Sequence, residues 1–269
     1  MTIRDRTERR LFSTIAGRAV PAVSVREMAE VDRIAVEQSG PTLLQMMELA
    51  GEQTALTAIE MLGAAHGPGW EDARVLVLAG TGSNGAGGVC AARHLANRGV
   101  DVTVVTIRRP TEADGALGQE LLALAEAPAR VITWDEAFDA GTAQLVIDAV
   151  IGYSLDGAPR ARQMALIRAS HAAGGPVLSL DVPSGLDPDT GEAPGVVVRP
   201  ARTLTLGLPK LGLRQDNAGE LWLADLGIPP GVYARAGIAF APVFGTESRV
   251  RLEYPPAGGA ADRRAGEGV

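Results

Sequence analysis

Short apolar runs recur along the chain, and each ends in a polar or glycine-rich turn. The runs lie at residues 75–78, 102–107, 144–151, 176–180, 203–207 and 221–225. Unbroken apolar runs of this length are typical of parallel strands that are covered on both faces. Segments with helical spacing of apolar positions separate most of them. The pattern therefore predicts an α/β protein with a three-layer, Rossmann-like fold and a mostly parallel sheet.

Two helices are predicted ahead of the first strand. Ser24 and Glu27 form an S-x-x-E capping box, and apolar residues follow at helical spacing. A second helix follows the Gly-Pro break at residues 40–41, and it is apolar enough to be mostly buried. We therefore expect Met46 and Met47 in the core rather than against a cofactor.

The first apolar run leads into Gly80, Gly82 and Gly85, which satisfy the G-x-G-x-x-G pattern. Glycine permits close backbone approach, and the N-terminus of a following helix attracts anions. The same turn also occurs where it only joins a strand tightly to a helix. The next strand ends on Arg108 and Arg109, where an NAD site carries an acidic residue. These arginines fit either a 2′-phosphate or a solvated surface.

The chain has 269 residues, of which 46% are hydrophobic, and this is enough for one sizeable core. We expect a single domain over residues 21–254. Residues 1–20 are rich in arginine with interspersed acids, and residues 255–269 are rich in glycine, alanine and proline. We expect a mobile tail at the N-terminal end and a disordered one at the C-terminal end.

The charge and the hydropathy of the chain limit its partners. A formal net charge of −7 argues against nucleic acid as a general partner, because binding to a phosphate backbone needs a basic footprint. No apolar run approaches the roughly 18 residues of a membrane helix, and the N-terminus lacks an uninterrupted signal-peptide core. We therefore expect a cytoplasmic protein that has a small-molecule substrate and no membrane partner.

Cysteine and histidine add little chemistry. Cys90 is the single cysteine, so the chain forms no internal disulfide. Its place early in the helix after the glycine turn indicates a small packed residue rather than a nucleophile. The three histidines, His66, His94 and His171, lie in unrelated segments without metal-ligand spacing, so we expect no zinc site.

Polar residues follow three of the predicted strands. They are Ser83 and Asn84, then Asp148 and Ser154, then Asp181 and Ser184. Because the carboxyl ends of parallel strands share one edge of a sheet, we expect these residues to converge on one crevice. Asp181 directly follows an apolar strand and precedes Pro183, which restricts the turn. An aspartate at this place is also consistent with a turn role alone.

With these segments the chain resembles the NAD(P)H-hydrate epimerases, also called the YjeF N-terminal domain family, from about Ser24 to Pro229. Six segments carry the resemblance in order: MMELAG, GTGSNGAGG, DAVIGYSLDGAPR, DVPSGLDPDTG, GLPKLGL and DLGIPP. Six ordered matches are far more specific than the glycine pattern alone. The family interconverts the R and S epimers of hydrated NADH and NADPH, so that a dehydratase can restore the cofactor.

The resemblance implies a site, a cation and an assembly. The substrate would contact Ser83, Asn84, Gly85, Ala86 and Gly87, then Gly152, Tyr153, Ser154, Leu155, Asp156, Gly157 and Ala158, and also Asp181 and Lys210. Asn84, Asp148 and Ser184 resemble the family's potassium site, and hard oxygen ligands suit such a cation. Asp181 is our candidate acid or base for proton transfer at the C6 hydroxyl. We also expect a homodimer. The sequence ends soon after DLGIPP, so if repair is the function we expect the dehydratase to be a separate protein.

Two departures from the family pattern affect the chemistry. Where the family loop reads GNNGGDG, the acid is replaced by Gly87, and where the second segment reads GFSFKG, the lysine is replaced by Asp156. Asp156 is therefore a second candidate catalytic carboxylate that could take over the lost acid. Loss of the family's activity, or a different isomerisation or cyclisation on a small molecule in a biosynthetic pathway, is equally consistent with this pattern. Lys210 is the only lysine of the chain, and it matches the family's Pro-Lys pair.

Two further function classes stay open at this point. A non-catalytic binding or dimerisation module is one, but a crevice of converging polar residues has no use in a scaffold. A plain NADP-dependent oxidoreductase is the other. It lacks support because no Tyr-x-x-x-Lys pair accompanies the glycine loop, since Tyr153 is followed four residues later by Gly157.

Overall fold

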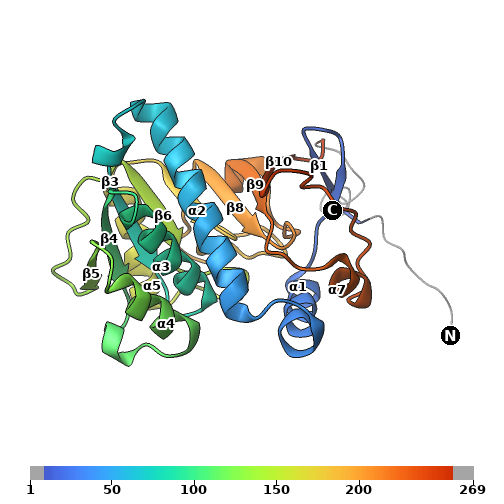
Figure 1. Cartoon of the computed structure of the whole chain (residues 1–269), viewed down its shortest axis with the longest axis horizontal. Helices are drawn as coiled ribbons and strands as arrows, with labels where there is room; N and C mark the ends of the chain where they lie inside the picture. The colour runs from blue at the N-terminus through green and yellow to red at the C-terminus, as the bar shows by residue number, and fades with distance from the viewer. Residues whose placement is uncertain (1–8, 257–269) are drawn as a thin grey trace, which may run out of the picture.

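The structure is a computed structural model that describes residues 9–256, and these residues contain one sheet of ten strands (Figure 1). The strand order is β2-β1-β10-β9-β8-β7-β6-β3-β4-β5. The parallel strands are β3 (Arg74–Ala79), β4 (Asp101–Thr106), β5 (Arg130–Thr133), β6 (Leu145–Ala149), β7 (Val177–Leu180), β8 (Arg202–Leu206) and β9 (Glu220–Ala224). The antiparallel strands are β10 (Arg249–Glu253), β1 (Leu11–Thr14) and β2 (Ala19–Pro21).

Helices connect and cover these strands. The α-helices are α1 (Val25–Ile34), α2 (Leu43–His66), α3 (Ser83–Ala96), α4 (Gly115–Leu124), α5 (Ala161–Ala172), α6 (Gln215–Ala218) and α7 (Pro230–Arg235). The π-helix η1 (Ala35–Ser39) continues α1, and two short 3₁₀ turns, η2 (Trp70–Asp72) and η3 (Pro110–Glu112), precede β3 and α4. Helix α4 lies between β4 and β5 in the sequence. In the part of the chain that the structure describes, no helix is long and apolar enough to cross a membrane.

The two faces of the sheet carry separate apolar layers, which confirms the predicted three-layer α/β fold. Side chains alternate along a strand, so Val75 and Val77 of β3 pack into the layer formed with α2, α3 and α4. Leu76 and Leu78 point the other way and pack with Leu166 of α5. In Figure 1 helices α2, α3 and α4 lie together in front of the sheet. All six predicted strands are confirmed.

The first two helices begin with the predicted chemistry. The Ser24 hydroxyl accepts a hydrogen bond from the Glu27 backbone N–H, and the Glu27 carboxylate accepts one from the Ser24 backbone N–H. Thr42 and Gln45 form the same reciprocal arrangement at the start of α2. These bonds satisfy backbone N–H groups that have no partner inside the helix.

Our expectation of a mobile segment over residues 1–20 is wrong for its second half. Residues 11–14 and 19–21 form strands that pair with one another, and β1 also pairs with β10. Phe12 is 1% exposed, and Val20 is fully buried. The buried side chains of these strands fill one end of the core. Their alternation with exposed residues is hard to recognise in a segment that is rich in arginine. Residues 1–8, and residues 257–269 of the expected C-terminal tail, lie outside the described residues.

The strand order creates a crevice at one place. From β3 the chain runs through β4 and β5 to one edge, and from β6 it runs through β7, β8 and β9 in the opposite direction. The order therefore reverses between the neighbouring strands β3 and β6. In open α/β sheets ligands bind outside the carboxyl ends of the strands at such a point. This topology places the candidate site.

Candidate active site

A cavity of about 400 Å³ lies at the carboxyl ends of β3, β6, β7 and β8. The predicted site residues that line it are Ser83, Asn84, Gly87, Gly152, Tyr153, Ser154, Leu155, Asp156, Ala158, Asp181 and Lys210. The predicted residues that do not line it are Gly85, Ala86, Gly157, Asp148 and Ser184. The expected convergence of three strand ends is therefore observed, with Asp148 and Ser184 packed behind the cavity wall.

The glycine turn brings the N-terminus of α3 to the cavity. A Cβ atom at Gly80 would overlap the carbonyl oxygen of Val150, and one at Gly85 would overlap the carbonyl oxygen of Gly80. Any larger residue at either position would push β3 away from β6 or open the turn. Helix α3 starts at Ser83 directly after this turn, and Gly82, Ser83 and Asn84 line the cavity, so the N-terminus of the helix lies at its wall.

Asp181 and Lys210 form a buried ion pair at the centre of the site. Lys210 is fully buried, and its ammonium group donates to Asp181 Oδ1 and, at 2.8 Å, to the carbonyl oxygen of Leu206. Asp181 Oδ2 accepts the backbone N–H of Tyr153 at 2.9 Å. Among the described residues, Asp181 is the one non-glycine residue with a positive φ, 71°. Strained backbone of this kind is characteristic of functional sites.

Asp148 is fully buried on β6, beside the strand β7 that leads to Asp181. Its carboxylate accepts hydrogen bonds from the Ser179 hydroxyl at 2.8 Å and the Ser184 N–H at 2.9 Å, and a longer one from the Val150 N–H at 3.3 Å. All three donors are uncharged. Burial raises the pKa of Asp148 above its usual value, and the hydrogen bonds from Ser184, Ser179 and Val150 oppose that increase.

Asn84 lies close to Asp181 at the cavity wall. The amide oxygen and nitrogen of its side chain are buried and have no hydrogen-bond partner among the described residues. A Cβ atom built on Gly152 would lie 2.9 Å from Asp181 Oδ2 and 3.3 Å from Asn84 Cγ, so these two side chains flank the same glycine. Buried amide groups are normally paired. An unpaired one beside a buried carboxylate indicates space for a ligand.

The two departures from the family pattern both line the cavity. Gly87 is buried in α3, and a Cβ atom there would come within 2.9 Å of the end of the Leu180 side chain. Asp156 is exposed on the loop after β6. The cavity wall therefore has no carboxylate at position 87 and has one on the exposed loop instead.

Three other expectations can be compared with the cavity wall. Met46 and Met47 are buried, as expected, and they also line the cavity, so a core position and a site position coincide. Arg108 and Arg109 are exposed and do not line it. Arg160, just before α5, does line it. The cationic group at the cavity that sequence reasoning missed is therefore on the loop that follows β6.

Sequence reasoning also missed Asp32. This residue is on α1, lines the cavity, and accepts a hydrogen bond of 2.5 Å from the Tyr153 hydroxyl. Burial raises the pKa of the Asp32 carboxyl, while the Tyr153 hydroxyl and the charge of Lys210 act in the opposite direction. The available signal was its spacing, because Asp32 is four residues after Met28 and beside Val31 on the apolar stripe of the helix.

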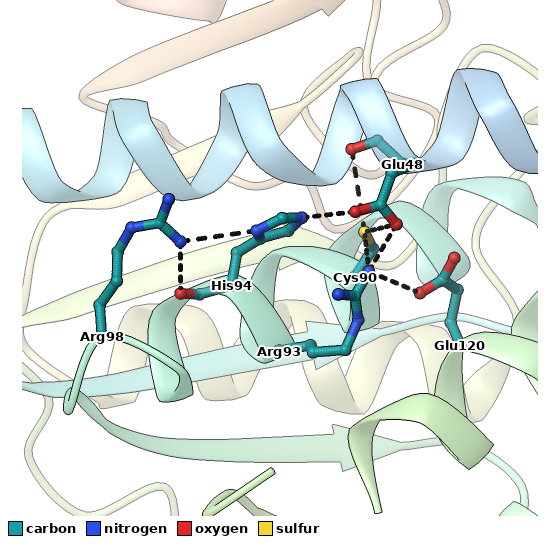
Figure 2. A network of polar contacts seen from close by, with 6 residues as sticks. All are labelled: Glu48, Cys90, Arg93, His94, Arg98 and Glu120. Atoms are coloured by element: carbon teal, nitrogen blue, oxygen red, sulfur yellow. Dashed lines mark hydrogen bonds and ion pairs between the residues drawn. The ribbon is translucent and has the colours of Figure 1, made fainter. Parts of the chain in front are cut away.

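A second polar cluster joins α2, α3 and α4 away from this cavity (Figure 2). Glu48 accepts from Arg93 at 2.5 Å and contacts His94 Nε2 at 2.8 Å and Cys90 Sγ at 3.5 Å, and Arg93 also lies 3.7 Å from Glu120. Cys90 is buried, as expected.

The ligand-type atoms of Glu48, Cys90 and His94 lie within 4.8 Å of one another, a grouping that histidine spacing alone could not reveal. However, Arg93 Nη2 contacts both the Glu48 carboxylate and, at 3.4 Å, the Cys90 sulfur. A metal bound to these atoms at about 2.0–2.3 Å would lie against a guanidinium. We therefore interpret the cluster as an ion-pair network that holds three helices together.

Comparisons with known proteins agree with this fold and site. The family described as YjeF-related protein N-terminus matches residues 43–212. A protein of Dehalogenimonas lykanthroporepellens named NAD(P)H-hydrate epimerase is 48% identical over 227 residues, which cover 84% of this chain and 90% of that protein. A bifunctional NAD(P)H-hydrate repair enzyme of Hyperthermus butylicus is 40% identical over 228 residues, but the chain spans only 39% of its length.

A solved structure shares the architecture. The crystal structure of yeast ynu0 superposes with a TM-score of 0.75 at 25% sequence identity, and the match covers 87% of this chain and all of that one. The matched family segment contains the glycine turn, the loop after β6, Asp181 and Lys210. The chain belongs to the YjeF-related protein N-terminus family.

Proposed function

We propose that the chain is an NAD(P)H-hydrate epimerase, an isomerase that interconverts the R and S epimers of hydrated NADH and NADPH. Relatives that bear this name match nearly their full length, as the Dehalogenimonas protein does at 90%. The observation that carries the proposal is the buried Asp181–Lys210 pair on the wall of the cavity at the sheet's switch point. The comparisons do not favour a binding module or a plain oxidoreductase.

The geometry assigns a role to each part of the cavity wall. Epimerisation at C6 requires that a bond to this carbon breaks and re-forms on the opposite face of the ring, with proton transfer at the hydroxyl. Asp181 accepts from Lys210 and from the Tyr153 N–H, and these bonds fix the orientation of its carboxylate. A carboxylate held in this way is suited to transfer a proton at a fixed atom. For Asp156, which is exposed and lines the cavity, we propose a contact with a less buried part of the substrate.

The phosphate groups of the substrate match two features of the wall. The N-terminus of α3 presents its free N–H groups after the glycine turn, and Arg160 adds a cationic side chain from the other side of the loop after β6. Helix N-termini and arginine are the usual partners of phosphate in proteins. Lys210 is fully buried and bonded to Asp181, so its charge serves the carboxylate and not the phosphates.

We also propose that Asn84, Asp148 and Ser184 bind potassium. Support comes from the buried Asn84 amide without a partner and from the Asp148 carboxylate, whose donors are all uncharged. A monovalent cation bound there would balance the Asp148 charge behind Asp181. The Ser184 hydroxyl already bonds the backbone of Ile151 as donor and acceptor, so Asn84 offers the freest oxygen of the three.

The cation proposal has a direct thermodynamic test. We expect a higher melting temperature in potassium chloride than in tetramethylammonium chloride at equal ionic strength, because a ligand that binds only the folded state stabilises it. Asn84→Ala and Asp148→Ala should abolish this difference, while Asp101→Ala at an exposed strand end should retain it. Equal melting temperatures of the wild type in the two salts would exclude the site.

Assembly and location are further parts of the proposal. We propose that the protein is a homodimer and that it works in the cytoplasm, as we expect from the sequence. Light scattering coupled to size-exclusion chromatography measures the mass directly. A monomer at working concentration would contradict the dimer.

The activity itself is tested by following the hydrated NADPH epimers by chromatography. We expect the wild type to equilibrate a purified single epimer, and Asp181→Asn to lower the rate by about 10²–10⁴-fold, the usual contribution of a general acid or base. The exposed variant Asp101→Asn is the control. A wild type without epimerase activity would mean that Gly87 and Asp156 mark a changed substrate, and turnover of Asp181→Asn within about threefold of wild type would remove Asp181 from this role.

A further inference from the structure

The cavity contains a second carboxylate that reaches it from a different element. Asp181 follows β7, whereas Asp32 comes from α1, near the end of the sheet where α1 and α7 lie (Figure 1). Tyr153 links the two, since its hydroxyl donates to Asp32 Oδ2 at 2.5 Å and its backbone N–H donates to Asp181 Oδ2 at 2.9 Å. Two carboxylates from different elements thus share one cavity and one connecting residue.

The proposed reaction needs two such groups. For inversion at C6, one group protonates the hydroxyl, the C6–O bond breaks with its electron pair on the departing water, and the N1 lone pair forms a C6=N1 bond. Water then bonds to C6 from the opposite face, the C6=N1 electron pair returns to N1, and a second group takes the proton. A single carboxyl cannot be within the required distance of about 2.6–3.2 Å on both faces of a planar ring.

We propose that Asp32 is a further catalytic residue, the acid–base partner of Asp181 on the other face of the substrate ring, and that Tyr153 is the residue that positions it. The inference rests on the proposed epimerase function. One of the two carboxyls must enter each turnover protonated and the other ionised, and they exchange these states when the reaction runs in reverse.

The two carboxyl groups have different surroundings, as an acid and a base in one site require. Asp181 is ion-paired with Lys210, so the charged form is compensated. Within residues 9–256 no cation is bonded to Asp32. Burial together with the charge of Asp181 raises its pKa, against the opposing effects of the Tyr153 hydrogen bond and the Lys210 charge. The charged and titratable groups that face it are Tyr153, Lys210, Asp181 and, from α7, the Tyr233 hydroxyl. Titratable groups whose environments separate their protonation states are typical of acid–base pairs in enzymes.

Tyr153 has two features that suit a positioning role. Burial and the neighbouring Asp32 raise the pKa of its hydroxyl, so it stays a hydrogen-bond donor and does not itself carry the charge. Lys210 lies 5.4 Å from the centre of the Tyr153 ring, which further restricts where this ring can move.

The test compares three variants in the epimer assay with the wild type. We expect Asp32→Asn to lower turnover by about 10²–10⁴-fold. We expect Tyr153→Phe to stay active. The fall in its turnover at high pH, where the acid Asp32 loses its proton, should move to higher pH, because the variant lacks a hydrogen bond that lowers the pKa of Asp32. Glu30→Gln, an exposed acid on the same helix that pairs with Arg33, should match the wild type in rate and pH profile.

These outcomes distinguish a failure of the proposed function from a failure of the proposed role of Asp32. An inactive wild type overturns the proposed function, and this inference falls with it. An active wild type with Asp32→Asn turnover within about threefold overturns the role of Asp32 alone. If Asp32→Asn melts far below the wild type, the Tyr153→Phe profile decides, and an unchanged profile overturns the pairing of Tyr153 with Asp32.

Discussion

The buried pair of Lys210 and Asp181 leads to a quantitative prediction. Lys210 is fully buried and Asp181 is 3% exposed, so each charge depends on the other for compensation. Lys210→Met keeps the volume of the side chain roughly constant but leaves the Asp181 carboxylate without its counter-charge. It also removes the hydrogen bond to the Leu206 carbonyl. The change therefore removes the counter-charge and this hydrogen bond with little loss of packing.

Breaking a buried pair by removal of one partner costs about 3–5 kcal/mol, because an uncompensated charge stays in the interior. For a domain of this size that corresponds to a fall in melting temperature of about 6–20 °C. The double variant Lys210→Met, Asp181→Asn removes both charges and should recover a large part of the loss. A non-additive cycle of this kind is the signature of a direct interaction.

The measurement is the free energy of unfolding from urea titration, followed by circular dichroism, for the wild type and the variants. Arg74→Met is the matched control, because Arg74 and Asp101 form an exposed pair at 3.6 Å with side chains 54% and 67% exposed. Exposed pairs contribute about 0–1 kcal/mol. A Lys210→Met variant that loses no more than the Arg74→Met variant would refute the reasoning.

Three further predictions concern single groups. The Cys90 thiol should react with a disulfide reagent only after unfolding, because burial and the charges of Glu120 and Glu48 raise its pKa; rapid stoichiometric labelling of the native protein would contradict this. Ser24→Ala should cost about 1 kcal/mol in urea unfolding through loss of the N-cap, and an unchanged midpoint would show that the cap contributes nothing. Because the folded-state pKa of Asp148 is raised, the folded protein holds the extra proton, and without potassium the free energy of unfolding should fall as the pH rises above the ordinary value of 3.8. Asp148→Asn should flatten that decline, and an equal slope in both proteins would assign it to other groups.

Much of the fold could be predicted because burial of the central strands on both faces gives continuous apolar runs in the sequence. Strands such as β3 and β6 are buried on both faces, so every position is apolar except Arg74 at the start of β3 and Asp148 near the end of β6. Each run is therefore visible without any knowledge of its partners. Strands β1, β2 and β10 lie at the antiparallel end of the sheet and mix buried with exposed residues. Such short alternating segments resemble loops until the neighbouring strand is known.

Most of the candidate site was predicted from residues at or just after strand ends, whereas Asp32 of α1 and Arg160 of the loop after β6 were missed. Asn84, Asp148 and Asp181 are each tied to a strand end, and parallel strands place such ends together whatever the details of packing. Asp32 belongs to a helix whose position against the sheet depends on the packing of α1. The link from Glu48 of α2 to Arg93 of α3 has the same origin.

By itself the sequence determined the strands, the glycine turn, the polar strand ends and the family of this protein, because each of these is recorded in neighbouring residues. Only the tertiary structure decided that the single lysine pairs with Asp181, that Tyr153 joins Asp181 to Asp32, and that the N-terminal residues complete the sheet. These contacts join segments up to 240 positions apart, as Ser13 and Glu253 are. Local periodicity predicts whether a residue is buried. Which residue it contacts in space depends on the order and packing of whole elements.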